Sequence, residues 1–189
     1  MINLAILASG SGSNAEAIIR YFKDHETIKV VLILSNNSNA GVLNRAKEHN
    51  VKSIVVNSEQ TKQGVLFNEL KNNHIDYIIL AGYMKLVPKQ IIEAFPKRIL
   101  NIHPALLPKF GGKGMYGMNV HQAVVQAQEK ESGMTIHYVS EHYDEGAIIF
   151  QEAVSLSDSD TPEEVAKKVL KLEHKNYPRV IEEVVNGKH

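Results

Sequence analysis

The chain alternates short apolar runs with longer amphipathic stretches, and this alternation limits the possible folds more than any other feature of the sequence. The first apolar runs are rich in valine and isoleucine and are predicted to be strands, at residues 3–8, 29–34, 53–56 and 77–82. The stretches between them have helical patterning, near residues 14–23, 40–49 and 61–72. Runs that are apolar on both faces and separated by helices are typical of a parallel sheet built from βαβ units. We therefore expect an α/β fold, with right-handed crossovers and helices on both faces of an open, twisted sheet.

The pattern changes in the second half of the chain. The apolar segments 99–103, 134–139 and 147–154 lie closer together, and the last two are joined by the polar, turn-like segment 140–146. This spacing predicts an antiparallel extension of the mostly parallel sheet toward the C-terminus.

A long helix is predicted for residues 162–185. Thr161 can cap it, Pro162 suits its first position, and Glu164 completes a capping box. Pro178 lies inside the helix and is expected to kink or divide it.

The composition favours a small ligand. Lysine plus arginine number 21, and aspartate plus glutamate also number 21, so no basic field favours nucleic acid. The absence of cysteine excludes disulfides, thiolate metal ligands and a cysteine nucleophile. No apolar run approaches about 20 residues, and the N-terminal run lacks the basic start of a signal peptide. We expect a cytoplasmic protein without a membrane partner.

A glycine-rich segment follows the first predicted strand and opens the first predicted helix. Gly10, Gly12 and Ala15 form a GxGxxA pattern within ASGSGSNAEAII (8–19). The pattern suits a dinucleotide loop, but that site needs an acidic residue after the second strand, where residues 35–37 are Ser-Asn-Asn.

The same loop could bind a single phosphate. Backbone N–H groups at a helix N-terminus attract anions, and Ser13 and Asn14 would add side-chain donors. Alternatively, Ser13 or Asn14 merely caps the helix. The residues alone leave the cap, the monophosphate site and the dinucleotide site open.

Polar side chains gather at the end of segment 99–103. Asn101 and His103 alternate within a predicted strand, so they point to the same face. An asparagine amide can donate to a developing oxyanion, and a histidine can exchange a proton near neutral pH. The four glycines of segment 111–117 would make the next loop pliable enough to act as a lid. Asp144 could accept a hydrogen bond from the histidine, although a structural pair and an ordinary turn residue would give the same pattern.

Five segments carry a resemblance to a known family: ASGSGSN (8–14), LAGYMKLV (80–87), NIHPALLPKF (101–110), GMTIHYV (133–139) and DEGAIIFQ (144–151). In this order and spacing the chain resembles the phosphoribosylglycinamide formyltransferases, a folate-dependent family of purine biosynthesis, over nearly its whole length. The resemblance implies a Rossmann-like formyltransferase fold as a single domain, 1–189. Its phosphate-binding half would cover about 1–98, and its folate and catalytic half about 99–189.

The resemblance also implies roles for individual residues. Asn101, His103 and Asp144 match the catalytic trio of the family. The implied substrate contacts are Gly12, Ser13, Asn14, Gly82, Pro104 and Glu173. The implied folate contacts are Met84, Lys85, Leu86, Val87, Leu100, Asn101, Val139, Ser140, Glu141 and Asp144. No metal is implied.

Other interpretations of these positions stay open. Met84, Leu86 and Val87 could be core beneath a loop, and Glu173 could be a solvated helix charge. We expect His137 to lie near the site without doing chemistry. The chain departs from the family at Lys85, where arginine is frequent, and in its longer glycine-rich loop.

The implied activity is formyl transfer from 10-formyltetrahydrofolate, as co-substrate, to the amine of glycinamide ribonucleotide. The implied partners are these two small molecules, with no nucleic acid and with a monomer or homodimer as the assembly. Other 10-formyltetrahydrofolate-dependent transferases or hydrolases share the fold but carry extra domains, which the length of 189 residues does not favour. A nucleotide-binding module without chemistry is the alternative from another class, and it would not need the three side chains to meet.

Overall fold

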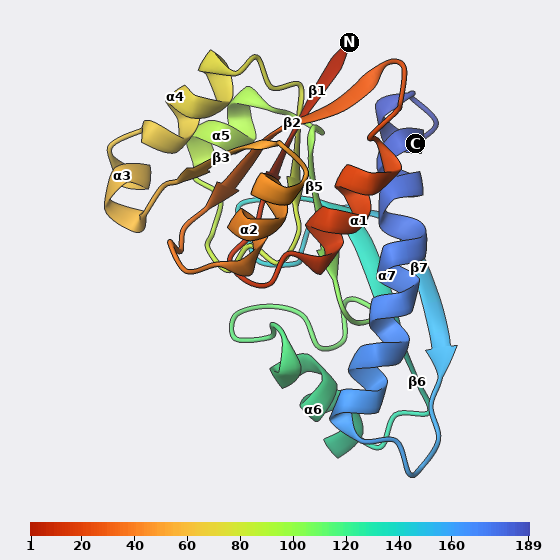
Figure 1. The fold of residues 1–189 in the computed structure, drawn as a ribbon. Helices are drawn as coiled ribbons and strands as arrows, with labels where there is room; N and C mark the ends of the chain where they lie inside the picture. Colours follow the sequence, from red (N-terminus) through yellow and green to blue (C-terminus); the bar gives the residue numbers. More distant parts are fainter. The chain divides into compact units, whose positions relative to one another are not determined.

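The structure is a computed structural model that describes residues 1–189. The chain forms two compact units, Met1–Leu100 and Asn101–His189. Figure 1 shows the helices and strands of both units. The boundary between the two units lies between Leu100 and Asn101, within the strand β5 (Ile99–His103).

Four strands of the first unit pair in parallel. They are β1 (Ile2–Leu7), β2 (Ile28–Ser35), β3 (Lys52–Val55) and β4 (Tyr77–Leu80). β1 lies between β2 and β4, and β2 also pairs with β3. The side chains from Leu4 to Leu7 are fully buried. Both faces of β1 are therefore covered, as its unbroken apolar run predicts.

Five helices belong to the first unit: α1 (Ser13–Tyr21), α2 (Gly41–Glu48), α3 (Ser58–Lys62), α4 (Val65–Asn72) and α5 (Lys89–Ala94). α2 contacts α1 as well as β2 and β3. α1 buries Ala15, Ile18 and Ile19 on one face. This packing brings the start of α2 against the glycine-rich loop that precedes α1.

The second unit pairs a hairpin with a long helix. β5 (Ile99–His103) enters it, and α6 (Met118–Gln126), β6 (Glu131–Tyr138), β7 (Ile148–Ser155) and α7 (Pro162–Val185) follow. β6 and β7 are antiparallel, and α7 packs on both strands and on α6 (Figure 1). α7 is the longest helix, with 24 residues, yet no helix is both long enough and apolar enough to cross a membrane.

The seven strands have the order β3-β2-β1-β4-β5-β6-β7. β1 to β4 are parallel, whereas the β6–β7 hairpin at the other end is antiparallel. This order confirms the predicted α/β class, with a mostly parallel sheet and an antiparallel extension.

Three local predictions differ from the structure. The helix predicted over 61–72 is two helices, because Gly64 adopts a left-handed conformation (φ +82°) between α3 and α4. The sequence pattern also does not predict α5 and α6, which are short and begin after Pro88 and Gly117. The sequence predicts that Pro178 kinks or divides the last helix, and it does not divide it, because α7 continues through it. Pro178 is buried along with Tyr177, Val180 and Ile181, and such packing stabilises a helix more than propensity does.

The capping box of α7 gives a test of this local structure. The Thr161 hydroxyl accepts from the Glu164 N–H, and the Glu164 carboxylate accepts from the Thr161 N–H at 2.7 Å. Thr161→Ala is expected to lower the free energy of unfolding by about 1 kcal/mol, because a helix N–H loses its acceptor. Thr161→Ser keeps the hydroxyl and is the matched control in urea denaturation. Equal losses in both variants would show that the cap does not stabilise α7.

Candidate active site

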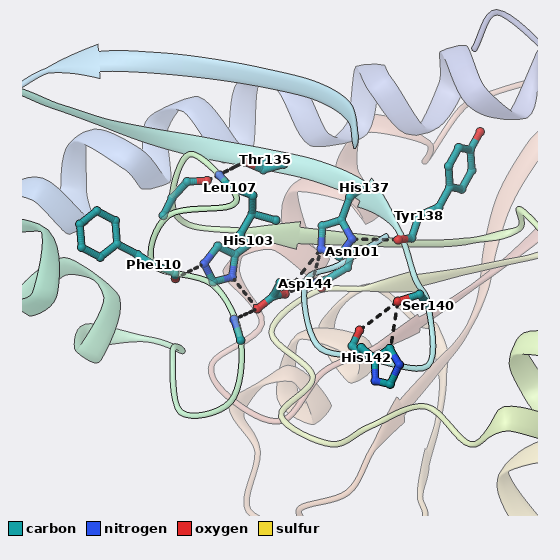
Figure 2. Close-up of polar contacts among 12 residues, drawn as sticks. Asn101, His103, Leu107, Phe110, Thr135, His137, Tyr138, Ser140, His142 and Asp144 are labelled. Atoms are coloured by element: carbon teal, nitrogen blue, oxygen red, sulfur yellow. Dashed lines mark hydrogen bonds and ion pairs between the residues drawn. The ribbon is translucent and has the colours of Figure 1, made fainter. Parts of the chain in front are cut away.

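Asn101, His103 and Asp144 meet within the second unit. Asn101 and His103 lie on β5 and point to the same side, and Asp144 lies in the turn between β6 and β7 (Figure 2). The His103 Nδ1 atom is 3.5 Å from the Asp144 Oδ2 atom. The Asn101 Nδ2 atom is 3.4 Å from the other carboxylate oxygen. One carboxylate therefore faces both strand side chains.

His137 on β6 is a fourth member of this cluster. Its Nδ1 atom is 2.9 Å from the Tyr138 carbonyl oxygen, and a carbonyl can only accept, so Nδ1 carries a proton. Its Nε2 atom is 3.1 Å from Asn101 Nδ2 and 3.6 Å from Asp144 Oδ1. In the neutral ring Nε2 accepts from the Asn101 amide and fixes which way that amide faces. The sequence places His137 near the site, and the structure adds this direct contact with Asn101.

The surroundings of His103 offer acceptors to both ring nitrogens. Nε2 is 2.7 Å from the Phe110 carbonyl oxygen, so this atom carries a proton. Nδ1 faces the Asp144 carboxylate. Burial lowers the pKa of His103. The Asp144 charge and the hydrogen bond to the Phe110 carbonyl raise it by less, so the pKa of His103 stays below its ordinary value. The ring is thus held neutral near pH 7, with Nδ1 as the atom that can gain a proton.

Asp144 is ionised despite its position. Burial is the largest single influence and raises its pKa, but His137, His103 and the Gly112 N–H together lower it below the ordinary value. The Gly112 N–H donates to the Asp144 Oδ2 atom at 2.9 Å. The Asp144 carboxylate therefore contacts the glycine-rich loop 111–117 as well as His103 and His137.

The start of the glycine-rich loop 111–117 packs closely against His103 and Asp144. The Phe110 carbonyl binds His103, and the Gly112 N–H binds Asp144. A Cβ atom on Gly111 would lie 2.6 Å from the Leu107 side chain and 3.3 Å from the Asp144 Cβ atom. A larger residue at position 111 would therefore have to displace the Leu107 side chain and press on Asp144.

A second polar network holds the segment that follows β5. The buried Thr135 hydroxyl donates to the Ala105 carbonyl at 2.6 Å and lies 3.0 Å from the Leu107 N–H, which donates to it. The Gln151 amide donates to Thr135 and to the Leu107 carbonyl. Thr135 and Gln151 were not predicted as site residues. The period of two along β6, which places Thr135 on the same face as His137, was the available signal.

The glycine-rich loop of the first unit has no side-chain cap. Gly12 is the N-cap residue of α1, with φ +78°, and no side-chain hydrogen bond caps the helix there. The interpretation of Ser13 or Asn14 as a simple helix cap is therefore wrong. Both side chains are half-buried at the start of α1.

The folate positions implied in the first unit differ in exposure. Met84 and Leu86 are 47% and 48% exposed, so neither is core beneath a loop. Val87 and Leu100 are buried, so their side chains are not presented to solvent. Lys85 is exposed, as is Gly82, which adopts φ +77°. The Met84 N–H donates to the Ser9 hydroxyl at 2.9 Å, which fixes this segment beside the end of β1.

The remaining implied positions lie in the second unit. Val139 and Ser140 are half-buried and Glu141 is exposed, all in the turn that also carries Asp144, while Pro104 follows β5. Glu173 on α7 is only 6% exposed, so it is not a solvated helix charge. Burial raises the pKa of Tyr177 well above the ordinary value, and the charge of Glu173 adds to this rise. No three His, Asp or Glu side chains are grouped as metal ligands.

The comparisons with known proteins agree with one another. The model of the formyl transferase family matches residues 2–181. The chloroplastic phosphoribosylglycinamide formyltransferase of Arabidopsis thaliana is 44% identical over 94% of this chain and 63% of its own length. The phosphoribosylglycinamide formyltransferase of Bacillus subtilis is 34% identical over 98% of this chain and 95% of its own. The chain spans less than two thirds of the plant relative.

A solved structure gives the same result for the fold. Glycinamide ribonucleotide transformylase 1 of Symbiobacterium toebii superimposes with a TM-score of 0.91, at 34% identity over 99% of this chain and 89% of its own. The fold, the family match and the relatives lead to one conclusion: the chain belongs to the formyl transferase family.

Proposed function

We propose that the protein transfers the formyl group of 10-formyltetrahydrofolate to the primary amine of glycinamide ribonucleotide. The contact of Asn101, His103 and Asp144 in one cluster is the observation that carries this proposal. Relatives named for this activity support it. A binding module without chemistry would not need these three side chains together, so their contact argues against that alternative.

The reaction joins an amine to a formyl carbon. The amine nitrogen attacks the formyl carbon, which becomes tetrahedral and carries an oxyanion. The bond from this carbon to N10 of the folate then breaks, and a proton lost by the amine is gained by N10. Catalysis therefore needs donors for the oxyanion and a group that accepts and returns a proton.

Asn101 supplies a donor for the oxyanion. One of its amide hydrogens is held by His137 at 3.1 Å, which orients the amide. The other faces Asp144 at 3.4 Å, a long and weak hydrogen bond, so this hydrogen is the one available to substrate.

His103 and Asp144 handle the proton. The Nε2–H of His103 is bound to the Phe110 carbonyl, so protonation occurs at Nδ1, beside the carboxylate. A proton taken from the amine gives an imidazolium that Asp144 stabilises and that can donate to the oxyanion or to N10. No metal and no covalent intermediate take part in this scheme.

The remaining contacts follow the family resemblance. The loop Gly12–Asn14 would bind the phosphate, and Glu173, Gly82 and Pro104 would contact the rest of the nucleotide. The segment Met84–Val87, Leu100 and the turn Val139–Glu141 would contact the folate, with Lys85 in place of the frequent arginine.

Removing the side chain of Asn101 or of His103 is expected to slow turnover strongly. Loss of one pre-aimed hydrogen bond to an oxyanion costs roughly 10²–10³ in kcat. Asn101→Ala and His103→Ala are each expected to show this loss in an assay of tetrahydrofolate release. Asn68→Ala, an exposed change on α4, is the control for the asparagine substitution. Losses below about tenfold in both site variants would exclude the proposed catalytic role.

The role of Asp144 can be tested through the titration of His103. In Asp144→Asn the ring loses the opposite charge that raises its pKa, so the already low pKa of His103 is expected to fall further. An NMR titration of the ring measures this directly, alongside kcat, which is expected to fall by roughly 10²–10⁴. Glu145→Gln removes an exposed carboxylate from the same turn and is the matched control. An unchanged His103 pKa with nearly normal kcat would mean that Asp144 only shapes the turn.

A further inference from the structure

Helix α2 holds the backbone of the glycine-rich loop in the first unit. The Val42 N–H, in the first turn of α2, donates to the Gly10 carbonyl at 3.1 Å. The Arg45 Nε–H, one turn further on, donates to the Ser11 carbonyl at 2.7 Å. Two consecutive carbonyls of the loop are therefore bound by the same helix.

The geometry of the peptide bond gives these contacts a consequence. In a trans peptide the carbonyl of one residue and the N–H of the next point in opposite directions. Because α2 binds the carbonyls of Gly10 and Ser11, the N–H groups of Ser11 and Gly12 point away from α2. Neither N–H donates to another backbone carbonyl of the chain, so both are available to an anion.

The loop fits against α2 without spare room. A Cβ atom on Gly12 would lie 2.6 Å from the Val42 side chain and 2.8 Å from its Cα atom. A Cβ atom on Gly41 would lie 3.2 Å from the Ser11 backbone. A substitution of Gly12 would therefore push the loop away from α2. A substitution of Arg45 removes the hydrogen bond to the Ser11 carbonyl and leaves Gly12 and Gly41 unchanged.

Arg45 also neutralises a charge beside the loop. Its Nη1 atom forms an ion pair with Glu16, in the first turn of α1, and Arg20 pairs with the same carboxylate. His49 Nε2 lies 3.6 Å from Glu16. The Arg45 guanidinium thus bridges a loop carbonyl and a carboxylate through two different nitrogens, Nε and Nη1, whose relative positions are fixed by the planar group.

We propose that Arg45 is a positioning residue for the phosphate of the substrate. It turns the Ser11–Gly12 peptide so that its N–H faces the phosphate, and it keeps Glu16 from repelling that anion. This inference rests on the proposed function only in taking the Gly12–Asn14 loop as the phosphate site. Arg45 acts through the loop backbone and is not itself a ligand.

The test compares Arg45→Met with Arg20→Met. Both remove an arginine that pairs with Glu16, but only Arg45 reaches the Ser11 carbonyl. Calorimetry with ribose 5-phosphate measures phosphate binding without turnover, and steady-state kinetics give KM for each substrate. Arg45→Met is expected to weaken ribose 5-phosphate binding and to raise the KM for glycinamide ribonucleotide by about tenfold. The KM for 10-formyltetrahydrofolate and kcat are expected to stay unchanged. Arg20→Met removes only one of the charges beside Glu16, so it is expected to weaken phosphate binding much less than Arg45→Met does.

Arg45→Lys keeps the positive charge, and it tests the positioning role of Arg45 if Arg45→Met does not fold. It is expected to weaken ribose 5-phosphate binding, because lysine has a single nitrogen in place of the separate Nε and Nη1 atoms that contact the Ser11 carbonyl and Glu16. Normal affinity in the folded Arg45 variants, equal losses in Arg20→Met, or an equal rise in the folate KM would overturn the proposal. Wild-type protein that binds ribose 5-phosphate but transfers no formyl group would refute the proposed function and leave the role of Arg45 intact. Wild-type protein that does not bind this probe would refute the role of Arg45.

Discussion

The half-buried carboxylate of Asp144 is the group on which the arrangement of the candidate site depends. A charge that is partly removed from water is costly unless charges and hydrogen bonds compensate it. Around it lie His103, Asn101 and the Gly112 N–H, with His137 next to one oxygen. Each of these groups has an atom directed at one negative charge. β5, the loop at Gly112, β6 and the turn at Asp144 thereby meet at one carboxylate.

The same compensation links the site to its loop. The Phe110 carbonyl fixes the proton on His103 Nε2, and the Gly112 N–H lies against Asp144. Movement of this loop would therefore change the partners of both groups at once. A reaction that moves a proton between His103 and its surroundings is thus coupled to the position of residues 110–112.

Much of this architecture could be predicted from the sequence. The apolar runs that became β1, β2 and β4 carry a strong pattern, because strands buried on both faces tolerate few polar residues. The shared face of Asn101 and His103 follows from the period of two in a strand. Thr161 and Glu164 predict the start of α7 because a capping box is a local motif.

The remainder depends on tertiary contacts that leave no local pattern in the sequence. The orientation of the Asn101 amide is set by His137, which is 36 residues away along the chain. The period of two along β6 places Thr135 on the same face as His137, but its role becomes clear only from its contacts with Ala105 and Leu107. Pro178 does not divide α7, because the packing of this helix outweighs the intrinsic preference of proline. The division at Gly64 was missed because a single glycine gives a weak signal inside an otherwise helical pattern.

In the proposed reaction His103 and Asp144 act as one unit in moving a proton. A double-mutant cycle on kcat, with His103→Ala, Asp144→Asn and the combined variant, tests it most directly. If the two residues act together, the combined variant loses no more activity than the more damaging single change, because removing one already disables the other. If the two losses multiply, the residues act independently, and the claim that they move the proton as one unit is contradicted.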